Sequence, residues 1–189
     1  MPQDVGADRQ QEPHPLTSLQ FESAPDPAAP IDMLEHYFSS HNWAFERAGD
    51  EEIVCTVKGS WSEYELRALW REDEGVLQFI ALTGISVPEA KASDARANVY
   101  EVLGLINEQL WLGHFELWSA DGSVLFRHAV LLDGEEDEPA LTLSQTEALV
   151  DAAIDECERF YPVFQFVLWG GKKPAEALQA ALLDTVGEA

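Results

Sequence analysis

The amino-acid sequence predicts an α+β domain of two layers, in which helices pack against an antiparallel meander sheet. A short helical pattern comes first, and four alternating apolar-polar segments then follow with no helix between them. Only short turn segments join these four, so their strands can pair only as antiparallel neighbours. The chain has 189 residues, 46% of them hydrophobic, which suits one domain with a continuous core.

We expect a flexible N-terminal arm over residues 1–29 and a single domain over residues 30–189. Residues 1–30 hold six of the ten prolines, and Phe21 is the only aromatic residue before the domain. Such a segment buries too little apolar surface to offset its ordering entropy. The first helix is expected to begin near Pro30, with Asp32 as its N-cap and Glu35 completing a capping-box-like pair.

The four strands are expected in "WAFER", "EEIVCTVK", "SEYELRALWR" and "VLQFIALT". In the third of these, the alternation is clearest, and it places four apolar side chains on one face: Tyr64, Leu66, Ala68 and Trp70. A second helix is predicted from Ser93 to about Leu112, with a buried stripe of Val99, Val102, Leu103, Ile106 and Leu110.

A hairpin follows in "GHFELWSADGSVLFRHAV", residues 113–130. A two-residue turn at Asp121-Gly122 would place Glu116 opposite Arg127 and Trp118 opposite Leu125. We therefore expect a cross-strand ion pair between Glu116 and Arg127. The next segment, "DGEEDE" at 133–138, has five acids in six residues and is interpreted as a solvated loop.

The third helix is expected to start with a capping box from Ser144 to Glu147 and to carry aromatic residues at its far end. Pro162 should kink or restart it. A short last helix is predicted from Pro174 to about Leu183, which makes the order α-β-β-β-β-α-β-β-α-α. This last helix, another subunit, or both together cover the aromatic surface. We expect that the residues binding a partner or a second copy are Trp118, Phe160, Tyr161, Phe164, Phe166 and Trp169.

Composition and motifs exclude several classes of function. The formal net charge of −24 disfavours nucleic acid and anionic membrane surfaces as partners. Phosphate-loop, dinucleotide-binding and serine-hydrolase motifs are absent from the sequence, as are paired cysteines at metal-ligand spacing, so no cofactor or metal is expected. Cys55 and Cys157 are expected to be buried thiols in a cytoplasmic protein, with one long-range disulfide as the alternative.

The hairpin offers an alternative function, a small-ligand sensor or an enzyme that uses His114, Glu116 and Arg127. These side chains share one strand face, but acid–base chemistry also needs a pocket and a second catalytic group. His128 falls on the more apolar face, where we expect a hydrogen-bonded core histidine. The favoured interpretation of this segment is an ordinary sheet.

Three segments resemble the YbjN family of bacterial proteins, whose fold is similar to that of type III secretion chaperones. They are "LEHYFSSHNWAFER", "LGHFELWSADGSVLFRHAVLL" and "CERFYPVFQFVLWGGKKPAEALQAALLDTVGEA", of which the last resembles the alphaproteobacterial branch. The resemblance covers residues 30–189. It implies a two-layer domain that commonly dimerises, belongs to a group described as sensory transduction regulators, and has no catalytic residues to carry over.

The resulting expectation is a non-enzymatic, homodimeric regulatory protein that binds another, unidentified protein. Secretion chaperones are small, acidic dimers that hold an extended partner segment against strands and apolar patches, and the acidity of this chain fits that resemblance. A domain that only mediates assembly of a larger complex remains a further alternative.

Overall fold

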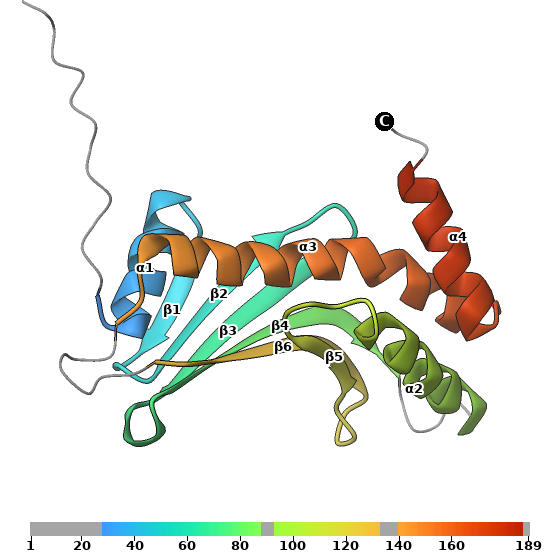
Figure 1. Cartoon of the computed structure of the whole chain (residues 1–189), viewed down its shortest axis with the longest axis horizontal. Helices are drawn as coiled ribbons and strands as arrows, with labels where there is room; N and C mark the ends of the chain where they lie inside the picture. The colour runs from blue at the N-terminus through green and yellow to red at the C-terminus, as the bar shows by residue number, and fades with distance from the viewer. Residues whose placement is uncertain (1–27, 88–92, 133–139, 187–189) are drawn as a thin grey trace, which may run out of the picture.

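The computed structural model describes residues 28–87, 93–132 and 140–186 (Figure 1). The predicted arm, apart from Ala28 and Ala29, and the acidic loop at 133–138 lie outside these residues. The observed elements are α1 (Pro30–Ser40), β1 (Phe45–Ala48), β2 (Glu52–Lys58), β3 (Glu63–Arg71), a 3-10 turn (Glu72–Glu74), β4 (Val76–Ser86), α2 (Ser93–Asn107), β5 (His114–Leu117), β6 (Ser123–Leu131), α3 (Leu143–Leu168) and α4 (Pro174–Val186). Their order confirms the α+β prediction.

The six strands of the described residues form one antiparallel sheet in the order β1-β2-β3-β4-β6-β5. The first four strands make the predicted meander, because each turn between them is too short for anything but an antiparallel neighbour. The hairpin extends this meander, with β6 beside β4 and β5 at the edge.

The helices form the second layer. α1 packs on β2 and β3, α3 runs across β4 and β6, and α2 packs beside β5, while the sheet face away from α3 carries no described helix (Figure 1). The side chains of β3 show why, since Tyr64, Leu66, Ala68 and Trp70 are buried and their neighbours are not. This alternation leaves one dry face for the helices to cover.

The edge strand β5 is closed by a side chain of α2. The Nδ2 group of Asn107 donates a hydrogen bond of 3.0 Å to the Phe115 carbonyl, and Oδ1 of Asn107 accepts one of 2.8 Å from the Phe115 N–H. Asn107 thus occupies the backbone groups that another strand would need at this position.

The predicted helix caps were wrong in detail. α1 begins at Pro30, with Ala29 as its N-cap, because the fixed φ of proline suits the first helical position. Asp32 therefore lies inside the first turn. In α3 the N-cap is Thr142, whose side chain accepts a hydrogen bond from the Gln145 N–H. The segment offers two overlapping capping-box patterns, and the upstream one is used.

The register of the hairpin also differs from the prediction. Glu116 lies opposite Leu125, and His114 lies opposite Arg127. The connection has four residues rather than two, because Trp118 pairs with Ser123 and Gly122 closes the turn with φ +76°. The shift is two residues, so every side chain stays on its predicted face.

α3 is a single helix with Pro162 inside it, so the helix does not restart there. Its C-terminal half is covered by this chain itself. α4 packs against α2 and α3, and Ala177, Leu178 and Ala181 of α4 are buried. The face of α3 that points into the core is therefore covered within the same chain, which was one of the expected arrangements.

Candidate functional site

The aromatic residues predicted at the end of α3 separate into buried and exposed groups. Phe160 and Phe164 are fully buried, and both rings contact Phe115 of β5. Tyr161 is buried, with 8% of its area exposed. Phe160 and Phe164 therefore belong to the core, and only the rest of the set can contact a second protein in this conformation.

Trp61, which the sequence analysis did not select, adds an exposed aromatic ring beside this helix. It lies in the loop between β2 and β3, stacks on Tyr161 with ring centroids 6.3 Å apart and planes within 8°, and is 51% exposed. The segment "KGSWSE" could have indicated this exposed ring, because a tryptophan in a turn segment has no neighbouring strand to pack against.

The loop that carries Trp61 is fixed to α3. The Ser60 N–H donates a hydrogen bond of 2.9 Å to Oε1 of Glu158. Gly59 lies so close to Glu158 and Tyr64 that a Cβ at this position would overlap both side chains. Burial, together with the Glu158 carboxylate, raises the pKa of the Tyr64 hydroxyl, which remains protonated.

At the C-terminal end of α3, Phe166 is half-buried and Trp169 is 61% exposed. The Lys172 ammonium lies 5.5 Å above the Phe166 ring. We call Trp61, Tyr161, Phe166 and Trp169 the α3 aromatic surface: Trp61 stacks on Tyr161, and Phe166 and Trp169 follow about one and two turns further along the chain. Exposed tryptophans of this kind are enriched at the centres of protein interfaces.

Trp118 does not belong to this surface, because it lies on the other face of the sheet. Its indole N–H donates a hydrogen bond of 2.9 Å to Oε1 of Glu116, and an Arg127 nitrogen lies 2.5 Å from the same oxygen. His114 Nε2 lies 3.8 Å from the other carboxylate oxygen. The predicted ion pair is confirmed, although it is diagonal rather than directly cross-strand.

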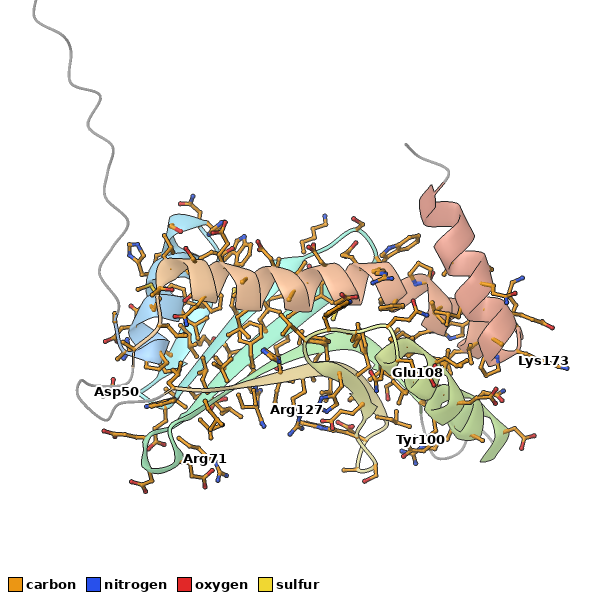
Figure 2. The ribbon with its side chains drawn as sticks, in the orientation of Figure 1. Asp50, Arg71, Tyr100, Glu108, Arg127 and Lys173 are labelled. Atoms are coloured by element: carbon orange, nitrogen blue, oxygen red, sulfur yellow. The ribbon has the colours of Figure 1, made fainter. Side chains whose placement is uncertain are left out.

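This cluster brings His114, Glu116 and Arg127 together, as the enzyme or sensor alternative requires, but they are engaged with one another. Arg127 also lies within 3.4 Å of Gln78 and points away from α3 (Figure 2). Oε1 of Glu116 already accepts from both Trp118 and Arg127, so it is occupied within the cluster. The arrangement is suited to holding the hairpin on the sheet.

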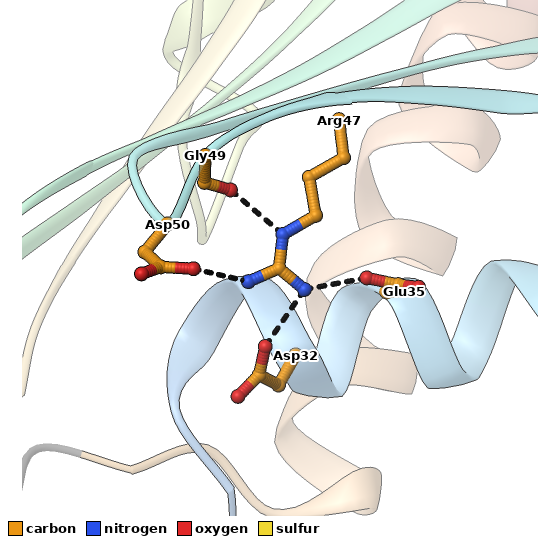
Figure 3. A network of polar contacts seen from close by, with 5 residues as sticks. All are labelled: Asp32, Glu35, Arg47, Gly49 and Asp50. Carbon is orange, nitrogen blue, oxygen red and sulfur yellow. Dashed lines mark hydrogen bonds and ion pairs between the residues drawn. The ribbon is translucent and has the colours of Figure 1, made fainter.

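A second polar network surrounds Arg47 of β1 (Figure 3). Its guanidinium contacts the carboxylates of Asp32 at 2.8 Å, Glu35 at 2.5 Å and Asp50 at 2.6 Å, and it donates to the Gly49 carbonyl. These contacts raise the pKa of Arg47 further above its ordinary value, led by the hydrogen bond to Glu35. All donors face partners within the chain, so the network joins α1 to the β1–β2 turn.

Among the described residues, histidine, cysteine and carboxylate side chains form no group of three or more that could hold a metal ion. None of the described helices has the length and apolar character needed to cross a membrane. Cys55 and Cys157 are both buried free thiols, so the disulfide alternative is not formed.

Comparison with known proteins gives a family match. The model of the YbjN family, described as "Putative bacterial sensory transduction regulator", matches residues 30–166. In a search of solved structures, a chain from the crystal structure of the ExsC-ExsE complex is similar, with 16% sequence identity and a TM-score of 0.47 over 68% of this chain and 88% of that chain. No curated protein matches the sequence.

Proposed function

This chain belongs to the YbjN family, and we propose that it is a non-enzymatic regulatory protein that acts by binding another protein. The observation that carries the proposal is the α3 aromatic surface, where Trp61 and Trp169 keep more than half of their area exposed. Tryptophan is the residue most enriched among interface positions that dominate binding energy.

The charge of the chain indicates what kind of partner fits. With 35 acidic and 11 basic residues, the surface attracts a basic partner and accelerates its association at low ionic strength. Lys172 and Lys173 lie next to Trp169, so this corner is less acidic than the molecule as a whole. We therefore propose a partner with an apolar anchor for the aromatic side chains and, away from Lys172 and Lys173, a basic surface that faces the acidic remainder of the molecule.

The homodimer is part of the same proposal and rests on the family resemblance. So does chaperone-like behaviour, in which the protein would protect an extended apolar client from aggregation. We place the protein in the cytoplasm, and its two buried free thiols support a reducing compartment.

The proposal is tested by comparing three forms of the protein. Wild type, the double variant Trp61→Ser/Trp169→Ser and the control Tyr100→Ser are cross-linked in cells and captured, and the mass of each purified form is measured in solution. Tyr100 is an exposed aromatic residue on α2, on a different surface (Figure 2).

We expect one protein to be captured by wild type and by the control but at least about tenfold less by the double variant, as for interface tryptophans in general. A partner retained equally by all three forms would remove the α3 aromatic surface from the proposal. A purified wild type that stays monomeric at micromolar concentration would remove the homodimer.

A further inference from the structure

A different surface, at the open edge of β6, has room for another strand. β5 pairs with β6 only from Val124 to Arg127, whereas β6 continues to Leu131. Within the described ranges, residues 128–131 have β4 on one side and no strand on the other. An unpaired edge of this length is a template for an added strand.

The backbone groups that face this open side follow from the hydrogen bonds of β5. Phe115 turns its N–H and C=O toward Asn107 and therefore away from β6. Because the direction alternates along antiparallel strands, its neighbours in β5 face β6, and Arg127 of β6 faces β5. The same alternation places the N–H and C=O groups of Ala129 and Leu131 at the open edge. The Leu131 residue is 79% exposed.

An apolar cavity of about 160 Å³ lies beside this edge, between β6 and α3. Side chains that line it include Leu112, His128, Val130, Leu141, Ala148 and Leu149. His128 and Val130 alternate with Ala129 along β6, so a strand added at the edge would direct every second side chain toward the cavity. An apolar cavity of about 150 Å³ can hold a benzene molecule, so this one has room for one phenyl ring.

The N-terminal end of the described chain lies against the wall of this cavity. Ala28 exchanges two backbone hydrogen bonds with Leu141, of 3.2 and 2.9 Å, and Leu141 is one of the lining residues. Phe21 is the only aromatic residue among 1–27, and the stretch from Pro15 to Phe21 carries no charge. The seven residues from Phe21 to Ala28 can reach up to about 25 Å.

We propose that the segment Leu16–Phe21 of the same chain adds as a short strand to the β6 edge and places the Phe21 ring in this cavity. Leu19 lies two residues from Phe21 and shares its side of the strand, toward Leu112. A tether this short gives an effective concentration of about 1 mM, which favours the chain's own segment over a separate peptide.

The test is the hydrogen exchange of the Ala129 and Leu131 amides in the full chain, in a chain without residues 1–25, and in Phe21→Ala. If the free segment binds with a Kd of about 0.1 mM, both amides should exchange about tenfold more slowly in the full chain than in the other two. A peptide of residues 14–23 added to the truncated chain should restore the slow exchange.

Ala148→Arg should block the cavity, so the Ala129 and Leu131 amides should exchange as fast as in the truncated chain. Ala175→Arg, the same change at an exposed position of α4, should leave their exchange slow. Equal exchange in the full chain, the truncated chain and Phe21→Ala would overturn the proposal. Protection that disappears on dilution of the full chain would also overturn it, because the edge would then be paired with a second copy.

Discussion

Asn107 at the end of α2 forms two hydrogen bonds with the backbone of Phe115 in β5, and so substitutes for a neighbouring strand. The pair holds the hairpin against the helix that precedes it and closes one edge of the sheet. It also shows that the Phe115 backbone groups point away from β6, from which the β6 residues that face the open edge follow by alternation.

Replacement of Asn107 by Ala should lower the free energy of unfolding by about 1–3 kcal/mol, because the Phe115 N–H and C=O lose their partners beside a buried ring. Urea denaturation measures this loss. Glu108→Ala, at the adjacent exposed position, serves as the control. If both variants lie within about 0.5 kcal/mol of wild type, the two hydrogen bonds contribute nothing measurable.

Phe164→Ala should destabilise the protein by about 3–5 kcal/mol, since the ring is fully buried and its removal leaves a cavity. Trp169→Ala should cost less than about 1 kcal/mol, because most of this side chain already contacts water. Thermal and denaturant unfolding of both variants separates a core residue from a surface residue. Similar losses in the two variants would mean that Trp169 packs more tightly than the structure indicates.

Arg47→Met should lower stability by about 1 kcal/mol at low ionic strength, because the three carboxylates around it lose their shared cation. Added salt should reduce the difference in the free energy of unfolding between Arg47→Met and wild type, since the network is partly exposed. Arg71→Met removes one exposed ion pair with Glu74 and should change stability by less than about 0.5 kcal/mol. The expectation fails if the two methionine variants unfold alike.

Acidification should weaken the fold through His128. Burial, and next the charge of His114, lower the pKa of His128 below its ordinary value of 6.5. The unfolded chain therefore binds this proton more readily, so the contribution of His128 is complete above pH 6.5 and is lost as the pH falls below it. Between pH 7.5 and 5.0, the free energy of unfolding of His128→Asn should change less than that of wild type. The control His36→Asn, at an exposed position, should change as much as wild type does.

The two thiols should be unreactive in the native protein. Burial raises the pKa of Cys55 to about 11 and that of Cys157 further still, so little of the reactive thiolate is present at pH 8. A thiol reagent should modify neither cysteine in buffer and both in denaturant. Finding no reactive thiol after denaturation would show a disulfide in place of the two free thiols.

The strands and helices could be predicted because their periodicity reports which side chains face the core. β3 alternates strictly between buried and solvent-facing residues, and α2 buries its predicted Val99, Val102 and Ile106. The hairpin register could not be predicted, because Asp-Gly fits both a two-residue turn and the end of a four-residue connection. The shift of two residues preserved the faces, so the ion pair between Glu116 and Arg127 was still found.

The candidate surface was only partly predictable for a similar reason. A helix that is apolar nearly all round indicates that it is covered, but not by which element. Phe164 is internal because its ring packs on Phe115 of β5, whereas Trp169 follows the last turn of α3 and stays exposed. The turn segment around Trp61 indicated an exposed tryptophan, but its contact with Tyr161 joins segments far apart in the sequence, which no local pattern reports.

The tether between Ser60 and Glu158 has a consequence for any molecule that contacts Trp61. A surface loop normally loses conformational freedom when it is bound, and that loss subtracts from affinity. Here the loop is preorganised, because a backbone hydrogen bond and the tight fit at Gly59 hold it in place while the indole rests on Tyr161. An incoming protein would therefore meet a ring that is already in position.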